Sequence, residues 1–439
     1  MAVTLHKQAN CGFVMLNSPP VNAINQKIRE DLIDAVTWAE SEGLERVILS
    51  GMGRSFAAGA DTKEFDQPAI SPHLPDVVNR IETSAVPWIA AIHGTALGGG
   101  GELALGCRYR IARADATIGF PEVILGLVPG AGATQRLPRL VGLAEALKLI
   151  PTGKIISGKA AMAIGLVNAI DDDPVAAAKL IDQKILSEAV PLSLMKAGTD
   201  KTVNYDTARQ IAIRRMRGQE APLTAISLLE TAQTATFDDG MQKERNAFLA
   251  LRVSSQARAL RHIFFAERAA KKPPKAIETQ KSTLKPLNHV IVIGGGTMGS
   301  GIAYAFLNAN IRVTILESDD AGMQRANTAI DTIISASLAS GHIDPQAATD
   351  RRNLLKVMMI QPDSDTGKWR NDDLTNVDLV IEAVFEDLAI KKEILQAIEP
   401  TLDPNAIIAT NTSYLDVNKL DACLDLSLIN ITEPTRPQS

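Results

Sequence analysis

The chain has 439 residues, of which 46% are hydrophobic and 22% charged, and its formal net charge at pH 7 is −5. This length predicts roughly two to four domains at about 150 residues each, and the composition is that of a soluble globular protein. The weakly acidic balance argues against a ligand such as nucleic acid or an anionic membrane surface.

Cysteine usage and the chain ends bear on metal content and compartment. Cys11, Cys107 and Cys423 are far apart, so we expect no disulfide framework and no metal site, and a reducing compartment fits. The N-terminus lacks the apolar core of a signal peptide, and no uninterrupted apolar run of about 18 residues predicts a membrane span. The last residues, TRPQS, are not a peroxisomal address of the SKL type. We expect a cytoplasmic protein, with the peroxisome as the alternative.

The first region, residues 2–189, alternates short apolar strands with helical stretches. Residues 46–50 and 88–92 are predicted as buried strands, and glycine-rich turns follow both, at 51–53 and 98–101. A strand that ends in glycine and opens into a helix is typical of an α/β fold.

The region from 190 to 267 is predicted to be mostly helical. Residues 240–251 place apolar side chains at i, i+3 and i+4. Because no group of catalytic residues is visible, we interpret this region as a packing and linking element.

Residues 271–288 are rich in proline and lysine and lack apolar periodicity, which predicts a linker.

The last region, 289–439, opens with a strand at 289–293, a glycine-rich turn and a helix at 300–308. A second strand follows at 311–317, which completes a βαβ unit. Later buried strands are predicted at 377–381 and 406–409.

Two turns in the first region are candidate ligand contacts. In the stretch 54–64, small residues let a ligand approach the backbone, and Lys63 and Glu64 indicate a helix start with unpaired N–H groups. The four glycines at 98–101 cost backbone entropy, so we expect them to serve close approach, with the positive end of the next helix directed at them. The alternatives are a tight strand-to-helix turn and a flexible loop.

Two carboxylates accompany these turns. Glu102 lies in the first turn of a helix, where acidic residues are common. Glu122 lies among apolar residues and glycines, where an ionised carboxylate needs a partner or a raised pKa. Paired carboxylates in a dry site can share a water and exchange protons with it.

Three segments resemble the core motifs of the crotonase, or enoyl-CoA hydratase/isomerase, superfamily. They are AAGADTKEF at 57–65, ALGGGGELALGCRYRIA at 96–112 and IGFPEVILGLVPGAGATQRLPRLVG at 118–142. The resemblance covers residues 1–190 and is to the subset with glutamate at both acid/base positions. It implies a crotonase fold, a ββα spiral.

The resemblance also implies roles. The N–H groups of Ala60 and Gly99 would form an oxyanion hole, and Glu102 and Glu122 would hold a water that adds to a trans-2-enoyl-CoA, without a cofactor. The same pair could instead isomerise a Δ3 to a Δ2 double bond. Acyl-CoA contacts are expected from Ala58, Asp61, Thr62 and Lys63.

The glycine run of the last region fits G-x-G-x-x-G between a strand and a helix, and Glu317 ends the second strand. An acidic residue there accepts the ribose 2′-OH, so NAD is favoured over NADP. The alternative is a glycine turn without a ligand. The expected NAD contacts are Gly294, Gly296, Met298, Gly299 and Glu317.

Residues 378–391 and 409–413 resemble L-3-hydroxyacyl-CoA dehydrogenases. The resemblance implies a Rossmann-type, doubly wound domain. Ala383, Val384, Glu386, Lys391 and Asn411 would line the NAD site, and Ser413 the substrate cleft. Residues 262–268 resemble the junction in bifunctional fatty-acid β-oxidation enzymes, so the chain resembles the N-terminal two-thirds of such a protein.

The sequence departs from that pattern at its end. The family places a catalytic histidine about twenty residues beyond the position of Ser413, and residues 421–439 contain none. We expect an incomplete Rossmann domain that binds NAD without dehydrogenase turnover. A truncated gene, a frameshift, a fragment of a complete bifunctional enzyme and a non-catalytic assembly protein stay open, as does the oligomeric state. The predicted domains are 1–189, 190–288 and 289–439.

Overall fold

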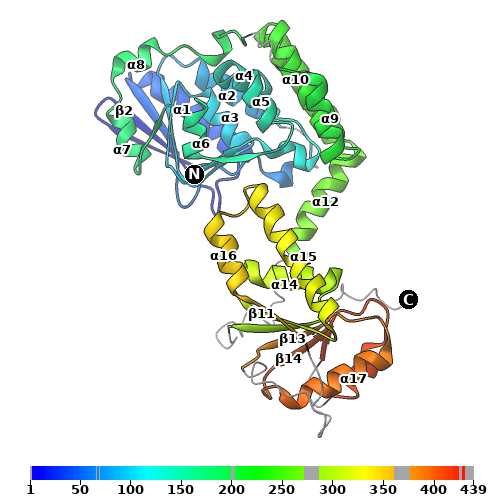
Figure 1. The fold of residues 1–439 in the computed structure, drawn as a ribbon. Coiled ribbons are helices and arrows are strands. Elements are labelled where there is room, and N and C mark those ends of the chain that lie inside the picture. The colour runs from blue at the N-terminus through cyan, green and yellow to red at the C-terminus, as the bar shows by residue number, and fades with distance from the viewer. Residues whose placement is uncertain are drawn as a thin grey trace. The chain divides into compact units, whose positions relative to one another are not determined.

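The computed structural model describes residues 2–65, 67–68, 70–198, 203–270, 286–359 and 376–424, and the backbone of 428–430. The chain forms two compact units, Met1–Pro273 and Pro274–Ser439 (Figure 1). Each unit has its own sheet and its own hydrophobic core. The linker predicted over 271–288 falls almost wholly outside the described residues.

The main sheet of the first unit has six strands in the order β1-β2-β3-β4-β6-β9. β1 and β2 form an antiparallel hairpin, and the other neighbours are parallel. Every residue of β4 is buried, as is usual for a parallel sheet covered on both faces. The strands are β1 (Val3–Gln8), β2 (Cys11–Leu16), β3 (Arg46–Gly51), β4 (Trp88–Ile92), β6 (Tyr109–Ala112) and β9 (Ala169–Ile170).

A second, smaller sheet brings distant segments together. β5 (Thr95–Leu97) pairs in parallel with β7 (Thr117–Gly119), which pairs antiparallel with β8 (Ile155–Ser157). An isolated bridge joins Ala57 to Ala96. The loop after Ala57 therefore lies beside the strand that leads into the glycine run.

Helices of the first unit pack on the main sheet and on one another. α1 (Gln26–Ser41) begins at an Asn25 cap whose side chain accepts from the N–H of Ile28. α2 contacts both α1 and α3, and α4 contacts α3 and α5. The other bounds are η1 (Thr62–Glu64), α2 (Leu74–Glu82), α3 (Gly99–Gly106), η2 (Pro121–Leu125), α4 (Ala133–Val141), α5 (Leu143–Leu149), α6 (Gly158–Ala163), α7 (Pro174–Lys179), α8 (Gln183–Glu188) and η3 (Leu192–Leu194).

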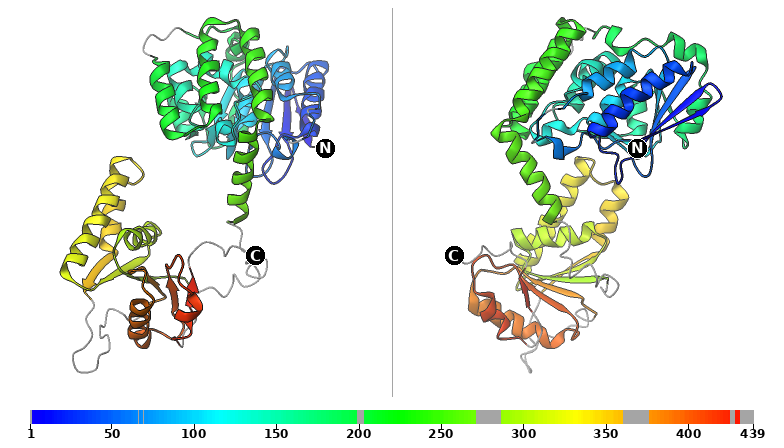
Figure 2. Two further views of the ribbon diagram at one scale, coloured as in Figure 1. Left: turned by 90° about the vertical axis from the view of Figure 1, so that its right-hand side faces the viewer. Right: turned by 180° about the vertical axis from the view of Figure 1, so that it is seen from behind.

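The helical segment predicted after residue 190 joins the first unit. Figure 2 shows these helices running along one side of that unit. Ala221, Ala225 and Leu229 of α10 belong to the same core as the main sheet, because α10 packs on α4. The helix predicted over 240–251 lies within α11. The bounds are α9 (Tyr205–Arg215), α10 (Glu220–Thr234), α11 (Phe237–Arg252) and α12 (Ser255–Ala270).

The second unit is a parallel sheet in the order β12-β11-β10-β13-β14-β15. The strand order reverses between β10 and β13, which is the arrangement of a doubly wound, Rossmann-type fold and confirms the expected fold class. Alternate residues of β10 enter two separate cores, one on each face. The strands are β10 (His289–Ile293), β11 (Arg312–Glu317), β12 (Leu355–Met359), β13 (Leu379–Glu382), β14 (Ile407–Thr410) and β15 (Leu428–Asn430).

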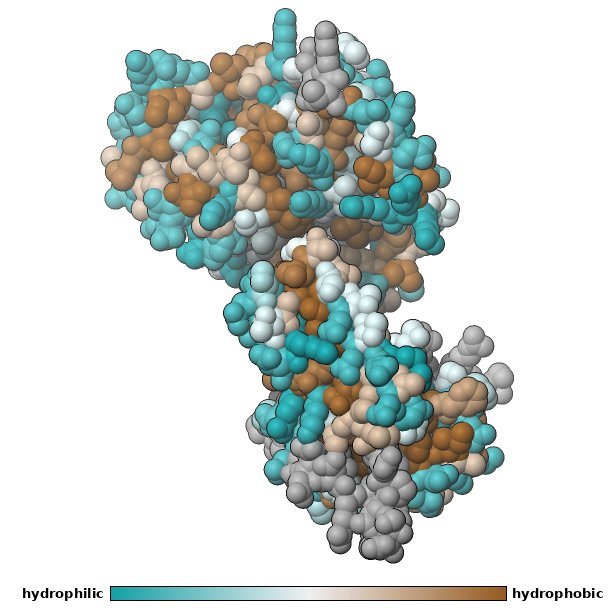
Figure 3. All heavy atoms as spheres, viewed as in Figure 1, coloured by the Kyte–Doolittle hydropathy of each residue, from teal (hydrophilic) through white to brown (hydrophobic). Residues whose placement is uncertain are grey.

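Helices cover this sheet, and α14 directly follows the glycine run. None of the helices in the described segments is both long and apolar enough to cross a bilayer. On the face of the first unit seen in Figure 3, apolar residues are interspersed with polar ones. The helices are α14 (Thr297–Asn308), α15 (Asp320–Ala339), α16 (Pro345–Asn353), α17 (Leu388–Ile398), η6 (Glu399–Thr401) and α18 (Val417–Asp421).

Candidate active site

A cavity of about 360 Å³ lies in the first unit and collects nearly all the predicted site residues of that region. This volume is within the usual range for small-molecule pockets. Lys63 is exposed and does not line the cavity, in contrast to the other predicted contacts. The predicted residues that line it are Ala58, Ala60, Asp61, Thr62, Gly99, Glu102 and Glu122.

Part of the cavity wall comes from α11 and α12, which the sequence interpretation treated as packing elements only. Phe248 and Phe264 contribute apolar surface, and Arg245 and Arg268 lie over these two rings. No local motif marks these residues, because helical periodicity does not reveal which distant segment a helix faces. The cavity therefore has an apolar wall that the sequence did not predict.

The glycine run is the start of a helix rather than a loop that precedes one, so that part of the prediction was wrong. α3 begins at Gly99. A Cβ on Gly100 would lie 2.1 Å from the carbonyl oxygen of Ala57, and one on Gly99 would lie 2.7 Å from Leu74. The glycines allow the close approach that was expected, but between α3 and its own neighbours.

Two residues with free main-chain amides, Ala60 and Gly99, line the same cavity. The position of a Cβ on Gly99 is 3.4 Å from the nitrogen of Ala60. Asp61 and Gly98, next to them in the chain, donate to Ile24 and Gly119, whereas neither the Ala60 nor the Gly99 N–H donates to any described residue. A helix N-terminus leaves such groups without partners. Two adjacent free N–H donors can bind one developing oxyanion.

The carboxylate of Glu102 is anchored. Its side chain is buried, and Oε1 accepts from the N–H groups of Ala131 at 2.8 Å and Ala133 at 3.2 Å. Burial raises the pKa of Glu102, and these two hydrogen bonds oppose the rise because they stabilise the ionised form.

The carboxylate of Glu122 is not anchored in this way. Its Oε2 is buried and has no hydrogen-bond partner among the described residues. Oε1 lies 3.0 Å from the position of a Cβ on Gly98, whose φ is +51°, so glycine leaves room for this oxygen. Burial, and then the charge of Glu102, raise the pKa of Glu122 well above its ordinary value. Glu122 therefore holds its proton more tightly than Glu102 does, although both residues are glutamates.

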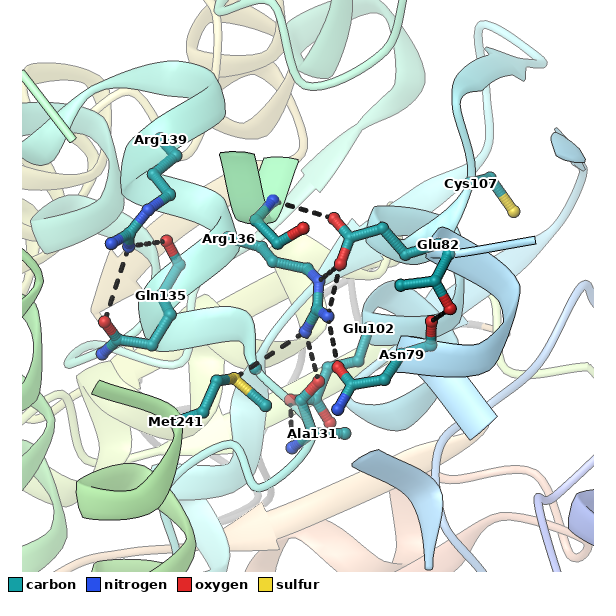
Figure 4. A network of polar contacts seen from close by, with 12 residues as sticks. Asn79, Glu82, Glu102, Cys107, Ala131, Gln135, Arg136, Arg139 and Met241 are labelled. Atoms are coloured by element: carbon teal, nitrogen blue, oxygen red, sulfur yellow. Dashed lines mark hydrogen bonds and ion pairs between the residues drawn. The ribbon is translucent and has the colours of Figure 1, made fainter. Parts of the chain in front are cut away.

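A buried ion pair supports the turn that holds Glu102 (Figure 4). Arg136 donates to Oε2 of Glu82 at 2.7 and 3.1 Å, and to the carbonyl oxygen of Ala131 at 3.0 Å. The Arg136 and Glu82 side chains are 0% and 3% exposed. The same residue, Ala131, thus connects this pair to Glu102 through its N–H.

The glycine loop of the second unit has the geometry of a dinucleotide site. Gly294 has a φ of +91°, and a Cβ on Gly299 would lie 1.8 Å from the carbonyl oxygen of Gly294. Gly296, by contrast, has open space where its Cβ would be, and it caps α14 without a side-chain bond. Glu317 ends β11 and accepts from the N–H of Gly295 at 2.5 Å. An open glycine at an uncapped helix start beside this acid fits the diphosphate and ribose of NAD.

Most of the remaining predicted cofactor residues follow the ends of β13 and β14, whereas Lys391 lies in α17 and Met298 in α14. Lys391 is fully buried and donates to Glu382 at 2.8 and 3.0 Å, with Glu386 at 3.2 Å. Its ammonium group therefore binds the end of β13 and the loop that follows it instead of facing solvent. Ala383 and Val384 follow β13, and the Asn411 N–H donates to the carbonyl oxygen of Glu382. Met298 is exposed.

Glu386 links the two strand ends. Its Oε1 accepts from Oγ1 of Thr412 at 2.5 Å and from the N–H of Ser413 at 2.9 Å. Burial alone would raise the pKa of Glu386, but these bonds and Lys391 lower it to about 2. Glu386 is therefore ionised at neutral pH.

The interval in which a catalytic histidine was sought, 421–439, falls mostly outside the described residues. Within the described segments, no group of three or more His, Cys, Asp or Glu side chains is arranged to hold a metal ion.

Comparisons with known proteins agree with this division. Residues 6–242 match the family described as enoyl-CoA hydratase/isomerase, and residues 289–427 match the 3-hydroxyacyl-CoA dehydrogenase NAD-binding domain.

Similar curated proteins carry both parts. The chain is 36% identical over 432 residues to the peroxisomal bifunctional enzyme of Cavia porcellus, covering 96% of this chain and 58% of that protein. The Homo sapiens protein of the same name is 35% identical over 426 residues, covering 94% and 57%. The peroxisomal fatty acid beta-oxidation multifunctional protein of Oryza sativa subsp. japonica is 33% identical over 428 residues, covering 92% and 57%. The chain thus spans a little over half the length of these relatives. Its first unit places it in the enoyl-CoA hydratase/isomerase family, and a 3-hydroxyacyl-CoA dehydrogenase-type NAD-binding domain follows in the same chain.

Proposed function

We propose that the first unit adds water to a trans-2-enoyl-CoA and releases a 3-hydroxyacyl-CoA, a step of fatty-acid β-oxidation. The observation that carries this proposal is one cavity lined by Ala60 and Gly99, whose N–H groups donate to no described residue, and by two buried carboxyl groups, of which that of Glu122 has the more strongly raised pKa. Family membership and relatives named for bifunctional β-oxidation support it.

In this mechanism, the N–H groups of Ala60 and Gly99 donate to the thioester oxygen. Charge develops there as water adds to the β-carbon and an enolate forms. Loss of one such donor costs roughly 3 to 4 kcal/mol of transition-state stabilisation in acyl-transfer enzymes.

Proton transfer is divided between the two acids. Glu102, held by two amides, is the ionised base that takes a proton from the water as its oxygen bonds to the β-carbon. Glu122, whose pKa is raised further, is the protonated acid that delivers its proton to the α-carbon. The sum is addition of H and OH across the double bond, after which proton exchange with solvent restores the starting states.

Isomerisation of Δ3- to Δ2-enoyl-CoA is a second candidate activity. It proceeds through a dienolate whose charge also lies on the thioester oxygen, with a proton removed at the α-carbon and one delivered at the γ-carbon. The unpartnered Oε2 of Glu122 favours it, because this oxygen is free to exchange a proton with carbon.

A direct test follows hydration of crotonyl-CoA by ultraviolet absorbance. Glu102→Gln and Glu122→Gln should each lower kcat by roughly 10²- to 10⁴-fold, the usual contribution of acid–base catalysis. Asp115→Asn, at an exposed acid in an ion pair with Arg113, is the matched control and should leave kcat unchanged. Unchanged rates in both glutamine variants would remove this mechanism. No hydration by the unmutated protein would favour a non-catalytic binding or assembly role.

For the second unit, we propose NAD binding at the glycine loop, with Glu317 at the adenosine ribose. NAD, when bound, accepts a hydride. Glu317→Gln should weaken NAD binding about tenfold or more in calorimetry, since a hydrogen bond to a charged group is worth roughly 1.5 to 3 kcal/mol. An unchanged Kd would contradict this site.

We still predict that the chain has no dehydrogenase turnover. NADH formation from L-3-hydroxybutyryl-CoA would overturn this prediction.

The compartment is also a proposal. The three relatives described above carry "peroxisomal" in their names, which favours the peroxisome over the cytoplasm. Co-localisation of an internally tagged chain with a peroxisomal matrix marker tests it, and diffuse fluorescence would favour the cytoplasm.

A further inference from the structure

A third buried glutamate lies close to the candidate active site but does not line its cavity. Glu244, on α11, is 0% exposed. Its Oε1 accepts from the N–H of Gly132 at 2.6 Å, and Oε2 accepts from the N–H and Oγ1 of Thr134 at 2.9 and 2.6 Å. Every one of these donors belongs to the turn that anchors Glu102.

Four successive amides of this turn are shared between two carboxylates in alternation. The N–H groups of Ala131 and Ala133 donate to Glu102, whereas those of Gly132 and Thr134 donate to Glu244. Gly132 has a φ of +108°, in the left-handed region that favours glycine.

α11 is held firmly against this turn. A Cβ on Gly240 would lie 2.1 Å from Oε1 of Gln135, so the helix packs closely on the first turn of α4. Glu244 is one helical turn further along the same face. The position of its carboxylate therefore follows from the packing of α11 on α4.

We infer that Glu244 is a positioning residue for the hydration. By accepting from the N–H groups of Gly132 and Thr134, it fixes the turn, and the turn then fixes the N–H groups of Ala131 and Ala133 that orient the Glu102 carboxylate. This inference rests on the proposed function of the first unit. It assigns a role in the active site to a helix from outside the segment that carries the family motifs.

A glutamine at this position cannot replace the carboxylate. Its single oxygen can accept from Gly132 or from Thr134, but its NH₂ group then meets the other N–H donor. One buried N–H is left without a partner, so the turn must move. The two donors to Glu102 move with it.

The test compares Glu244→Gln with Glu244→Asp, which keeps both acceptor oxygens, and with Asp238→Asn, an exposed acid-to-amide change on the same helix. For Glu244→Gln, kcat for crotonyl-CoA hydration should fall about 10- to 100-fold, the scale of an ångström-sized misplacement. The Kd for butyryl-CoA should stay within about twofold, because Glu244 does not line the cavity. Glu244→Asp should recover part of kcat, and Asp238→Asn should match the unmutated protein.

A second readout does not depend on turnover. Carboxyl ¹³C titration should show the pKa of Glu102 rising in Glu244→Gln, because its two amide donors lower that pKa. The charged groups that face Glu102 are Arg136 of α4, Arg245 and Glu244 of α11, and Glu122 of η2. Burial, and then the charge of Glu102, raise the pKa of Glu244 to about 8, so Glu244 carries little charge where Glu102 titrates. Loss of that charge alone would leave the pKa of Glu102 unchanged or lower it, so a rise separates positioning from a charge effect.

The outcomes separate the two proposals. If the unmutated protein does not hydrate crotonyl-CoA, the proposed function fails, and the titration alone decides the role of Glu244. A Glu102 pKa that is unchanged or lower in Glu244→Gln overturns the positioning role. So does a kcat within threefold of the unmutated value in an active enzyme. If Glu244→Gln does not fold, Glu244→Asp takes its place, and a kcat and Glu102 pKa identical to those of the unmutated protein would then overturn it.

Discussion

Glu102 and Glu122 differ in what their oxygens contact, and this difference gives one residue type two roles. Glu102 accepts from two amides, whereas Oε2 of Glu122 has no partner among the described residues. Ionisation is therefore easier for Glu102. The sequence alone could identify both acids, from a motif resemblance, but not which of them is anchored.

These environments predict a bell-shaped dependence of kcat/KM on pH. Both pKa values are raised, and that of Glu122 is raised further by the charge of Glu102. Activity should fall as pH drops through the pKa of Glu102, which must be ionised, and should fall again as pH rises through the pKa of Glu122, which must be protonated. Initial hydration rates across pH measure both limbs. A low-pH limb at or below about 4.3, the ordinary glutamate value, would contradict the proposed environment of Glu102.

The second prediction at this scale concerns Gly98. Gly98→Ala would bring a methyl group to 3.0 Å from Oε1 of Glu122 and would strain a backbone at φ +51°. We expect kcat to fall about 10- to 100-fold, since the acid is displaced from the substrate carbon. Gly53→Ala is the control, because Gly53 also has a positive φ but open space around its Cβ position. Equal activity in the two variants would mean that the methyl group does not disturb Glu122.

At the scale of elements, the sequence predicted strands well where they are short, apolar and bounded by glycine. β4 and β10 have the expected bounds. The sequence pattern placed the glycine run before its helix, whereas α3 in fact begins within the run. The pattern could not show that α3 packs on Ala57 at a distance that only glycine allows. The part of α11 in the site was missed for a similar reason. Glu244 meets Thr134 from 110 positions away, and no local pattern records that contact.

The turn between η2 and α4 depends on an ion pair that local patterns also do not record. Arg136→Met leaves the Glu82 carboxylate buried without its main partner, which typically costs about 3 to 5 kcal/mol. We expect the first unit to unfold at lower denaturant concentration in circular dichroism. The double variant Arg136→Met with Glu82→Leu should recover part of the loss, since no charge is then left unpaired. A double variant less stable than Arg136→Met alone would contradict this account.

At the scale of the whole molecule, the chain consists of two units with separate cores and separate chemistry. Both fold classes could be predicted because each unit carries segments that resemble the motifs of a known family. The grouping of the helices after residue 190 with the first unit could not, because it depends on their packing against α4, α5 and η2. The contacts of Lys391 and Glu386 could not be predicted either. The structure shows that Lys391 forms an ion pair with Glu386, and that Glu386 accepts from the N–H of Ser413, which follows β14.

The central claim is that Glu102 and Glu122 act in one addition as a single chemical unit, Glu102 on the water and Glu122 on the α-carbon. The most direct measurement is kcat for crotonyl-CoA hydration in Glu102→Gln, Glu122→Gln and the double variant. Residues that act as a unit give strongly non-additive losses, so the double variant should be about as slow as the slower single variant. If the two losses instead multiply, the glutamates act independently, and the mechanism in which both act in one addition is contradicted.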